Sequence, residues 1–168
     1  MTATDVQENT KPALDLKFIS HGTLECSDIE RTRKFYEEFL GFECVRASNV
    51  SLWCRLHNSA HIYVLVQIPS HDSEMPFTNH NGLDVATDEE VNEAHKIVTA
   101  EAEKWGIYKI TEPREQHGSY CFYFHDHDGN CWEILSNPNG GYGWMFERGD
   151  QEGRGHMAKG YDRPKLES

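Results

Sequence analysis

Apolar and polar residues follow one pattern along the chain, and that pattern occurs twice. Each copy begins with a short strand-like run that contains a histidine, near residues 18–27 and again near residues 78–87. Each run leads into a segment whose apolar residues recur every three or four positions, which is the period of a helix with one buried face. Because the two copies share this order, the pattern predicts an internal repeat.

Capping residues mark where the two predicted helices begin. Ser27 with Glu30, and Thr87 with Glu90, fit the capping box, in which a hydroxyl and an acidic side chain satisfy backbone donors at a helix start. After the glycine that ends each helix pattern come three short β-like runs, near residues 42–46, 51–56 and 61–68 in the first copy and near residues 108–111, 119–124 and 131–135 in the second. The sequence therefore predicts a βαβββ unit used twice.

The fold class expected from this order is α+β, with two βαβββ modules that form a curved mixed sheet around a metal site. The modules span about residues 13–69 and 76–138, and together they make a single domain of residues 13–138. We expect residues 1–12, which are polar and acidic, to be flexible. Residues 139–168 are rich in glycine and charge, so we expect an irregular tail there. Four apolar residues in it predict that the tail covers part of the pocket: Tyr142, Trp144, Met145 and Phe146.

Composition limits the partners and the compartment. The chain has 28 acidic and 16 basic residues and a formal net charge of −12, which would repel the phosphate backbone of a nucleic acid. No apolar run has the length of about 20 residues that a membrane-spanning helix needs. The five cysteines include no C-x-x-C pair, which suits reduced thiols. We therefore expect a soluble cytoplasmic protein that forms a homo-oligomer and acts on a small molecule.

Three residues that can bind a metal lie at equivalent places in the two modules. His21 and His80 lie on the first strand of each module, and Glu133 lies on the last strand of the second. Two histidines and one carboxylate leave open coordination positions and suit iron(II) or manganese(II). A strand histidine or glutamate is usually an ordinary residue, but Glu133 lies in the apolar run 131–135, where an unpaired carboxylate is costly to bury. We therefore predict a metal site, with iron(II) as the metal and manganese(II) as the alternative.

The sequence FYFHDHDGNCWE at residues 122–133 resembles the closing motif of the vicinal oxygen chelate superfamily, although His127 stands where that motif usually has proline. Glyoxalases, fosfomycin-resistance proteins, bleomycin-binding proteins and type I extradiol dioxygenases share this fold. The resemblance runs from about residue 18 to residue 138. The motif alone identifies only the superfamily.

Within that superfamily the chain is most similar to the catalytic half of the extradiol dioxygenases. The resemblance makes His21, His80 and Glu133 the iron ligands. It makes His61 the histidine that moves the protons of the substrate, and Tyr123 the tyrosine that hydrogen-bonds a substrate hydroxyl. It implies an iron(II)-dependent enzyme that cleaves a catechol-type ring with dioxygen.

One candidate catalytic residue departs from the family pattern. His117 lies closer to Tyr123 than the corresponding histidine of the family does, so its role stays open. The metal-free N-terminal half of the two-domain members is also missing, and the chain therefore resembles the one-domain type.

Other functions are found on the same fold. Glyoxalase-like isomerases and epimerases generally use four ligands, and the position that would supply the fourth falls in the apolar run 63–66, which argues against them. Thiol transferases can use two histidines and a glutamate, so they stay open. A metal-free protein that sequesters a small molecule would have no use for aligned metal-binding residues, and it is the least favoured alternative.

Overall fold

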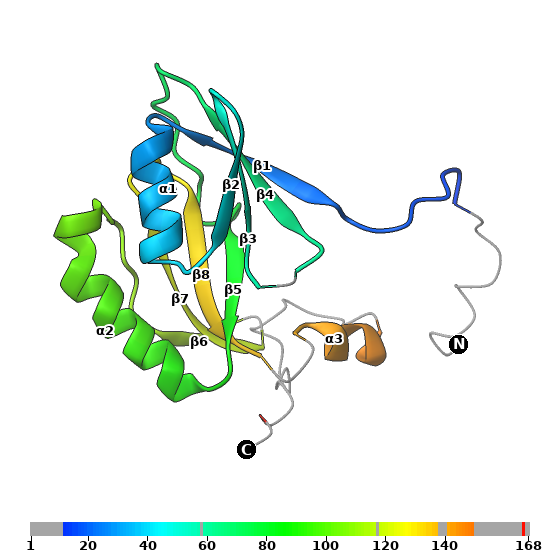
Figure 1. The fold of residues 1–168 in the computed structure, drawn as a ribbon. Helices are drawn as coiled ribbons and strands as arrows, with labels where there is room; N and C mark the ends of the chain where they lie inside the picture. The colour runs from blue at the N-terminus through cyan, green and yellow to red at the C-terminus, as the bar shows by residue number, and fades with distance from the viewer. Residues whose placement is uncertain (1–11, 58, 117, 138–140, 150–165, 167–168) are drawn as a thin grey trace.

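The computed structural model describes residues 12–57, 59–116, 118–137, 141–149 and 166, and it contains two βαβββ modules (Figure 1). The first module consists of β1 (His21–Cys26), α1 (Ile29–Glu38), β2 (Glu43–Ser48), β3 (Ser51–Arg55) and β4 (Ile62–Gln67). The second consists of β5 (Asn81–Val85), α2 (Asp88–Trp105), β6 (Arg114–Gln116), β7 (Ser119–His125) and β8 (Cys131–Ser136). A short helix, α3 (Gly143–Arg148), follows.

Each module forms its own four-stranded mixed sheet. The strand orders are β1-β4-β3-β2 and β5-β8-β7-β6, hereafter sheet A and sheet B. The first strand of each module is parallel to the last, and the other neighbours are antiparallel. Helices α1 and α2 lie on the same side of the molecule, which leaves the other face of each sheet without a helix of its own module (Figure 1). The predicted α+β class with two βαβββ modules is confirmed.

The two modules share one apolar core between helices and sheets. Phe35 and Tyr36 of α1 are fully buried, and their rings lie 5.7 Å from those of Trp105 in α2 and Trp132 in β8 respectively. Aromatic rings at this separation contribute about 0.5–1.5 kcal/mol per pair beyond the area that they bury. The core therefore fixes the second module against the first.

A hydrogen-bonded turn adds a polar connection between the modules. The turn joins β7 to β8 and requires a left-handed residue, which Gly129 supplies with a φ of 78°. The carboxylate of Asp128 in this turn accepts hydrogen bonds from the backbone and hydroxyl of Ser27, at 2.8 and 2.7 Å, and from the hydroxyl of Thr32. Since Ser27 and Thr32 belong to the first module, this carboxylate holds the start of α1 to the second module.

The start of α1 differs from its prediction. Asp28 caps the helix, because its carboxylate accepts from the backbone N–H groups of Glu30 and Arg31, whereas the expected cap Ser27 is used on Asp128. The cap of α2 by Thr87 is confirmed.

Two further expectations about secondary structure are wrong. Residues 108–111 form no strand, since Lys109 has a left-handed φ of 51° and only an isolated bridge joins Tyr108 to His125; the strand beside β7 is β6. The tail is not irregular throughout, because α3 forms there and buries Trp144. The remainder of the tail, apart from residue 166, and residues 1–11 lie outside the described residues. Among the described helices, none is both long and apolar enough to cross a membrane.

Candidate functional site

The open face of sheet B brings three of the predicted site residues together. Tyr123 of β7 lies directly opposite Glu133 of β8, and Gly82 of β5 lies opposite Glu133 on its other side. A Cβ atom added at Gly82 would lie 3.8 Å from Oε2 of Glu133, so the glycine leaves room beside that carboxylate. His80, which immediately precedes β5, extends over the same carboxylate.

His80 and Glu133 meet at a distance that requires a proton or a cation between them. Nε2 of His80 lies 3.2 Å from Oε2 of Glu133, while Nδ1 of the same ring lies 2.5 Å from the carbonyl oxygen of Phe77. Because that carbonyl can only accept, Nδ1 carries the hydrogen, and Nε2 of the neutral ring would turn a lone pair toward the carboxylate. Metal-binding histidines commonly donate their second N–H to a backbone carbonyl in this way.

The second oxygen of Glu133 is held by a tyrosine. The hydroxyl of Tyr123 donates to Oε1 of Glu133 at 2.8 Å and accepts from the side-chain amide of Gln116. Burial, and then the hydrogen bond to the Glu133 carboxylate, raise the pKa of the Tyr123 hydroxyl far above its usual value. The protonated hydroxyl of Tyr123 is therefore favoured as a donor to Glu133.

Burial makes this carboxylate expensive unless a cation compensates it. Glu133 is only 4% exposed, and it lies among the apolar side chains of Cys121, Cys131 and Leu135, which form a small cluster on the same face of the sheet. An imidazole nitrogen and a carboxylate oxygen are ligands that iron(II) and manganese(II) accept. The two side chains therefore fit a divalent metal.

The other predicted site residues lie elsewhere. His21 is exposed at the start of β1 in sheet A, where its Nδ1 lies 2.8 Å from the hydroxyl of Ser20. His61 immediately precedes β4, and its ring lies 5.3 Å from that of Tyr63. Within the described part of the chain, no group of three or more histidine, cysteine, aspartate or glutamate side chains is close enough to hold a metal. His117 lies outside the described residues.

Two contributors to the site were not identified from the sequence. Gln116 fixes Tyr123, but it belongs to β6, a strand of three residues that the apolar pattern does not reveal. Phe77 fixes His80 through its backbone carbonyl, which carries no residue-specific signal.

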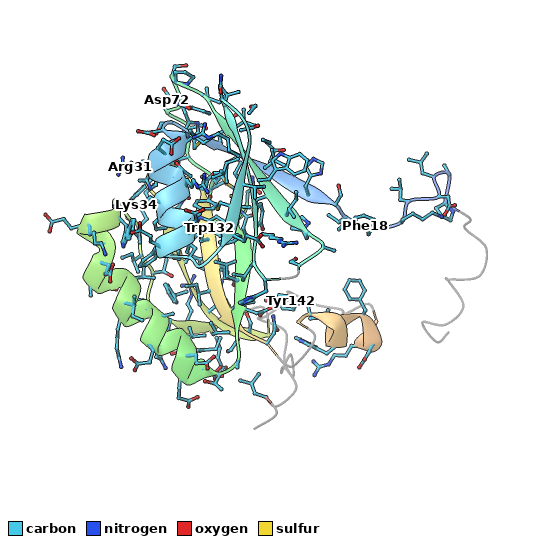
Figure 2. All side chains as sticks on the ribbon, in the orientation of Figure 1. Phe18, Arg31, Lys34, Asp72, Trp132 and Tyr142 are labelled. Atoms are coloured by element: carbon cyan, nitrogen blue, oxygen red, sulfur yellow. The ribbon has the colours of Figure 1, made fainter. Side chains whose placement is uncertain are left out.

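The segment that contains α3 packs on the same face of sheet B. Tyr142 is labelled in Figure 2. Its hydroxyl donates to the hydroxyl of Ser119 at 3.1 Å, and a Cβ atom added at Gly141 would lie 3.6 Å from Oδ2 of Asp84. Burial raises the pKa of Tyr142, the nearby Glu133 carboxylate raises it further, and the hydrogen bond between Tyr142 and Ser119 opposes this shift. Residues 141 and 142 thus lie at one end of the face that carries Glu133.

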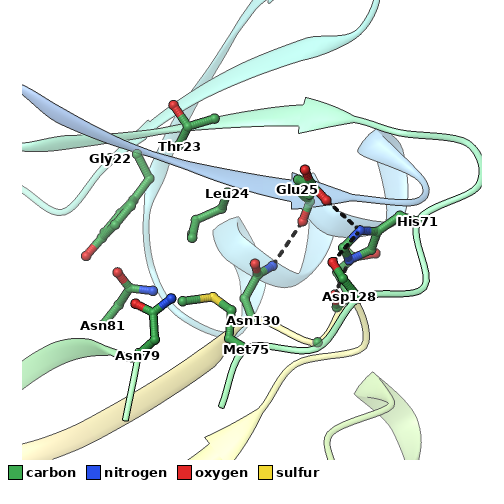
Figure 3. Close-up of a pocket in the computed structure, with 13 residues that line it drawn as sticks. Gly22, Thr23, Leu24, Glu25, His71, Met75, Asn79, Asn81, Asp128 and Asn130 are labelled. Atoms are coloured by element: carbon green, nitrogen blue, oxygen red, sulfur yellow. Dashed lines mark hydrogen bonds and ion pairs between the residues drawn. The ribbon is translucent and has the colours of Figure 1, made fainter. Parts of the chain in front are cut away.

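Near these residues lie two cavities that are lined by residues the structure describes. The larger, of about 700 Å³, lies on the open face of sheet B, and its lining includes Phe77, His80, Gln116 and Tyr123. The smaller, of about 340 Å³, lies between β1 and the second module (Figure 3). Beside it His71 contacts the Glu25 carboxylate at 2.9 Å and the Asp128 carbonyl at 2.6 Å. These two contacts connect β1 of the first module to the β7–β8 turn of the second.

Comparisons with known proteins identify the family and the fold. The family model described as Glyoxalase/Bleomycin resistance protein/Dioxygenase superfamily matches residues 18–134. The curated proteins contain no match.

Several solved structures are similar over most of the chain. The fosfomycin resistance protein FosX from Listeria monocytogenes, in complex with Mn(II) and sulfate, is 20% identical, with 78% of this chain and 98% of that chain covered and a TM-score of 0.59. A possible glyoxalase from Bacillus cereus is 22% identical, with coverages of 71% and 99% and a TM-score of 0.58. A lactoylglutathione lyase from Agrobacterium tumefaciens is 18% identical, with coverages of 73% and 96% and a TM-score of 0.53. At these identities the likeness establishes the fold alone.

Proposed function

This chain belongs to the glyoxalase/bleomycin resistance protein/dioxygenase superfamily, and we propose that within it the chain is an extradiol dioxygenase that opens a catechol-type ring with dioxygen. The observation that carries the proposal is the approach of His80 to Glu133 at 3.2 Å, with Tyr123 bound to the same carboxylate. The similarity of these positions to the ligands and tyrosine of the dioxygenases adds support from the sequence. A cavity of about 700 Å³ beside them has room for an aromatic ring.

His80 and Glu133 would hold a divalent metal, for which we propose iron(II). FosX, a structural neighbour, has been solved with Mn(II), which supports a divalent metal on this fold. When bound, the metal would supply a Lewis acid that holds both oxygens of a vicinal diol.

The chain's own residues position the ligands and move the protons. The Phe77 carbonyl orients the His80 ring, and Gln116 and Tyr123 together orient the Glu133 carboxylate. A catechol must lose a proton when it binds as a chelate, and a histidine can accept a proton near neutral pH. We assign this step to His61.

A second copy of the chain is the proposed source of the third ligand. The face of sheet A that is not covered by α1 carries His21 next to Ile62, and the adjacent row of that face contains Val45, Trp53 and Val64. Val45 and Trp53 are about half exposed. Such an apolar face in contact with water usually marks an interface. We propose that the open face of sheet A in one copy covers the open face of sheet B in another, with His21 reaching the pair His80 and Glu133.

The segment before β1 agrees with this assembly. Its apolar side chains are 66–79% exposed and include Leu14, Leu16, Phe18 and Ile19. The segment extends away from the body of the molecule (Figures 1 and 2). We propose that it packs on the second copy.

Mixing two inactive variants tests the shared site. His21→Ala and His80→Ala each remove one ligand, so neither homodimer holds a complete site. A mixed dimer would contain one intact site, and random assortment would restore roughly one quarter of the wild-type metal sites. If all three ligands come from one chain, the mixture restores none.

The reaction itself separates the candidate functions. Extradiol cleavage consumes one dioxygen per catechol and turns a colourless substrate into a yellow, conjugated product. The second candidate is metal-dependent isomerisation or nucleophilic addition, including thiol transfer, which is favoured by the fosfomycin resistance neighbour solved with Mn(II) and 1S,2S-dihydroxypropylphosphonic acid. Oxygen uptake together with yellow product from iron(II)-loaded protein supports the dioxygenase. Thiol addition or isomerisation without oxygen uptake supports the second candidate.

A further inference from the structure

The cavity beside His80 and Glu133 is lined by a positively charged side chain, Arg114, that has no role in the proposed reaction. Eight residues line this cavity of about 700 Å³: Phe77, Thr78, His80, Thr111, Arg114, Glu115, Gln116 and Tyr123. Arginine is charged at every physiological pH, so among these described lining residues Arg114 provides the one permanent positive charge.

Strand register places Arg114 on the same face of sheet B as Glu133, the face on which His80 approaches that carboxylate. In the antiparallel pairing of β6 with β7, Arg114 lies opposite Cys121, and Cys121 shares its face of the sheet with Tyr123. Glu115 lies opposite Tyr120, whose hydroxyl contacts Asn92 of α2 on the other face. The carboxylate of Glu115 also lines the cavity, but it forms no ion pair with the Arg114 guanidinium.

Hydrogen bonds fix Arg114 relative to the proposed ligands. Its Nε donates to Oε1 of Gln116 at 2.8 Å, Gln116 donates to the hydroxyl of Tyr123, and Tyr123 donates to Glu133. No ion pair with a carboxylate of the described residues is formed by Arg114. Its two terminal amino groups can therefore pair with an anion in the planar, bidentate geometry that suits a carboxylate.

We propose that Arg114 binds a carboxylate on the substrate, so that the substrate is a catechol that carries an acidic substituent. The net charge of −12 repels anions in general, so selection for such a substrate requires a local cation of this kind. Arg114 then fixes the ring at the end opposite the diol. This inference rests on the proposed metal site, because it places the diol at His80 and Glu133.

Binding of two catechols that differ in charge provides the test. The probes are 3,4-dihydroxybenzoate and its uncharged amide, titrated by calorimetry under nitrogen into protein loaded with Mn(II), so that no turnover is needed. We expect the carboxylate to bind at least about tenfold more tightly than the amide. Arg114→Gln should reduce this preference to about twofold or less. The preference is the ratio of two affinities measured on the same Mn(II)-loaded protein, so a change in Mn(II) affinity does not enter it. Arg114→Lys should retain part of the preference.

Arg33→Gln is the matched control, because Arg33 lies on α1 and pairs with Glu37 away from the cavity. It should keep the full preference. Equal binding of the two probes, no binding of either, or a preference that survives in Arg114→Gln would overturn the inference. Admission of oxygen then tests the reaction separately. If the preference depends on Arg114 but no ring opening occurs, the anion site stands and the dioxygenase proposal is wrong. If the ring opens but the two probes bind equally, the dioxygenase proposal stands and the anion site is wrong.

Discussion

The hydroxyl of Tyr123 donates to Oε1 of Glu133 at 2.8 Å, and the other oxygen of that carboxylate, Oε2, faces Nε2 of His80. The two oxygens of Glu133 thus have separate roles. One is held by a protonated tyrosine, and the other is presented to the histidine. This division fixes the direction in which Glu133 can bind a cation.

Tyr123→Phe tests that division. The ring should still pack against Phe77 and His80, so we expect the thermal unfolding temperature to change little. Loss of the hydroxyl should weaken metal binding about 10- to 100-fold, as for other groups that orient a ligand, and should lower turnover. Tyr120→Phe is the control, since the Tyr120 hydroxyl bonds Asn92 on the opposite face. If metal affinity and turnover are unchanged in Tyr123→Phe, Tyr123 contributes only to core packing and does not orient Glu133.

His61→Asn separates proton transfer from metal binding. His61 is not one of the three proposed ligands, so metal content and fold should be retained. Loss of a general base should slow ring opening by about 10²- to 10⁴-fold, most strongly near neutral pH. His57→Asn serves as the control because Asn tolerates the left-handed φ of 52° at that exposed position. If His61→Asn opens the ring as fast as the wild type, the proton-transfer role is wrong.

Asp128→Asn tests the polar connection between the modules. Burial would raise the pKa of this carboxyl, but hydrogen bonds from His127, Ser27 and Thr32 outweigh burial and hold the pKa well below its usual value. A lowered folded-state pKa contributes stability above the unfolded value of about 3.9, and that stability is lost as the pH falls through the folded value. At pH 7 the variant should lose about 1–3 kcal/mol of unfolding free energy.

Urea denaturation at pH 7 and pH 3 measures this effect. The difference in unfolding free energy between the wild type and Asp128→Asn should be smaller at pH 3 than at pH 7. Asp72→Asn, at an exposed position, is the control and should have the unfolding free energy of the wild type at both pH values. An equal loss for Asp128→Asn at both pH values would contradict the assigned electrostatic role.

Truncation after Asn137 tests whether the tail covers the pocket. Tyr142 contacts Ser119 at one end of the face that carries Glu133, so removal of the tail should weaken catechol binding several-fold and leave metal binding nearly unchanged. Phe146→Ser, at a position 86% exposed, is the control and should bind as the wild type does. Equal catechol affinity with and without the tail would refute this role.

The sequence predicted the repeated module because its apolar period changes from strand to helix at the same points in both copies. It also predicted that His21, His80 and Glu133 lie together, since equivalent strands of a repeat occupy equivalent places. The structure brings His80 to Glu133, but within one chain it does not bring His21 to them in the described residues. The place of Tyr123 was implied by the family resemblance. The third strand of the second module was misplaced because a left-handed residue, Lys109, interrupts an apolar run, and strand β6 has only three residues. Backbone contributions such as the Phe77 carbonyl depend on the tertiary fold and leave no mark in the sequence.

Metal binding by anaerobically prepared protein tests the central claim most directly. The wild type should bind one iron(II) per chain, measured by elemental analysis after removal of free metal. His80→Ala and Glu133→Gln should bind at least about 100-fold more weakly, because each removes one of two ligands that already lie 3.2 Å apart. Glu93→Gln, on α2 where Glu93 pairs with Lys96 away from the cavity, should bind as the wild type does. Full iron content in His80→Ala and Glu133→Gln would contradict the account, because the metal would then be held elsewhere.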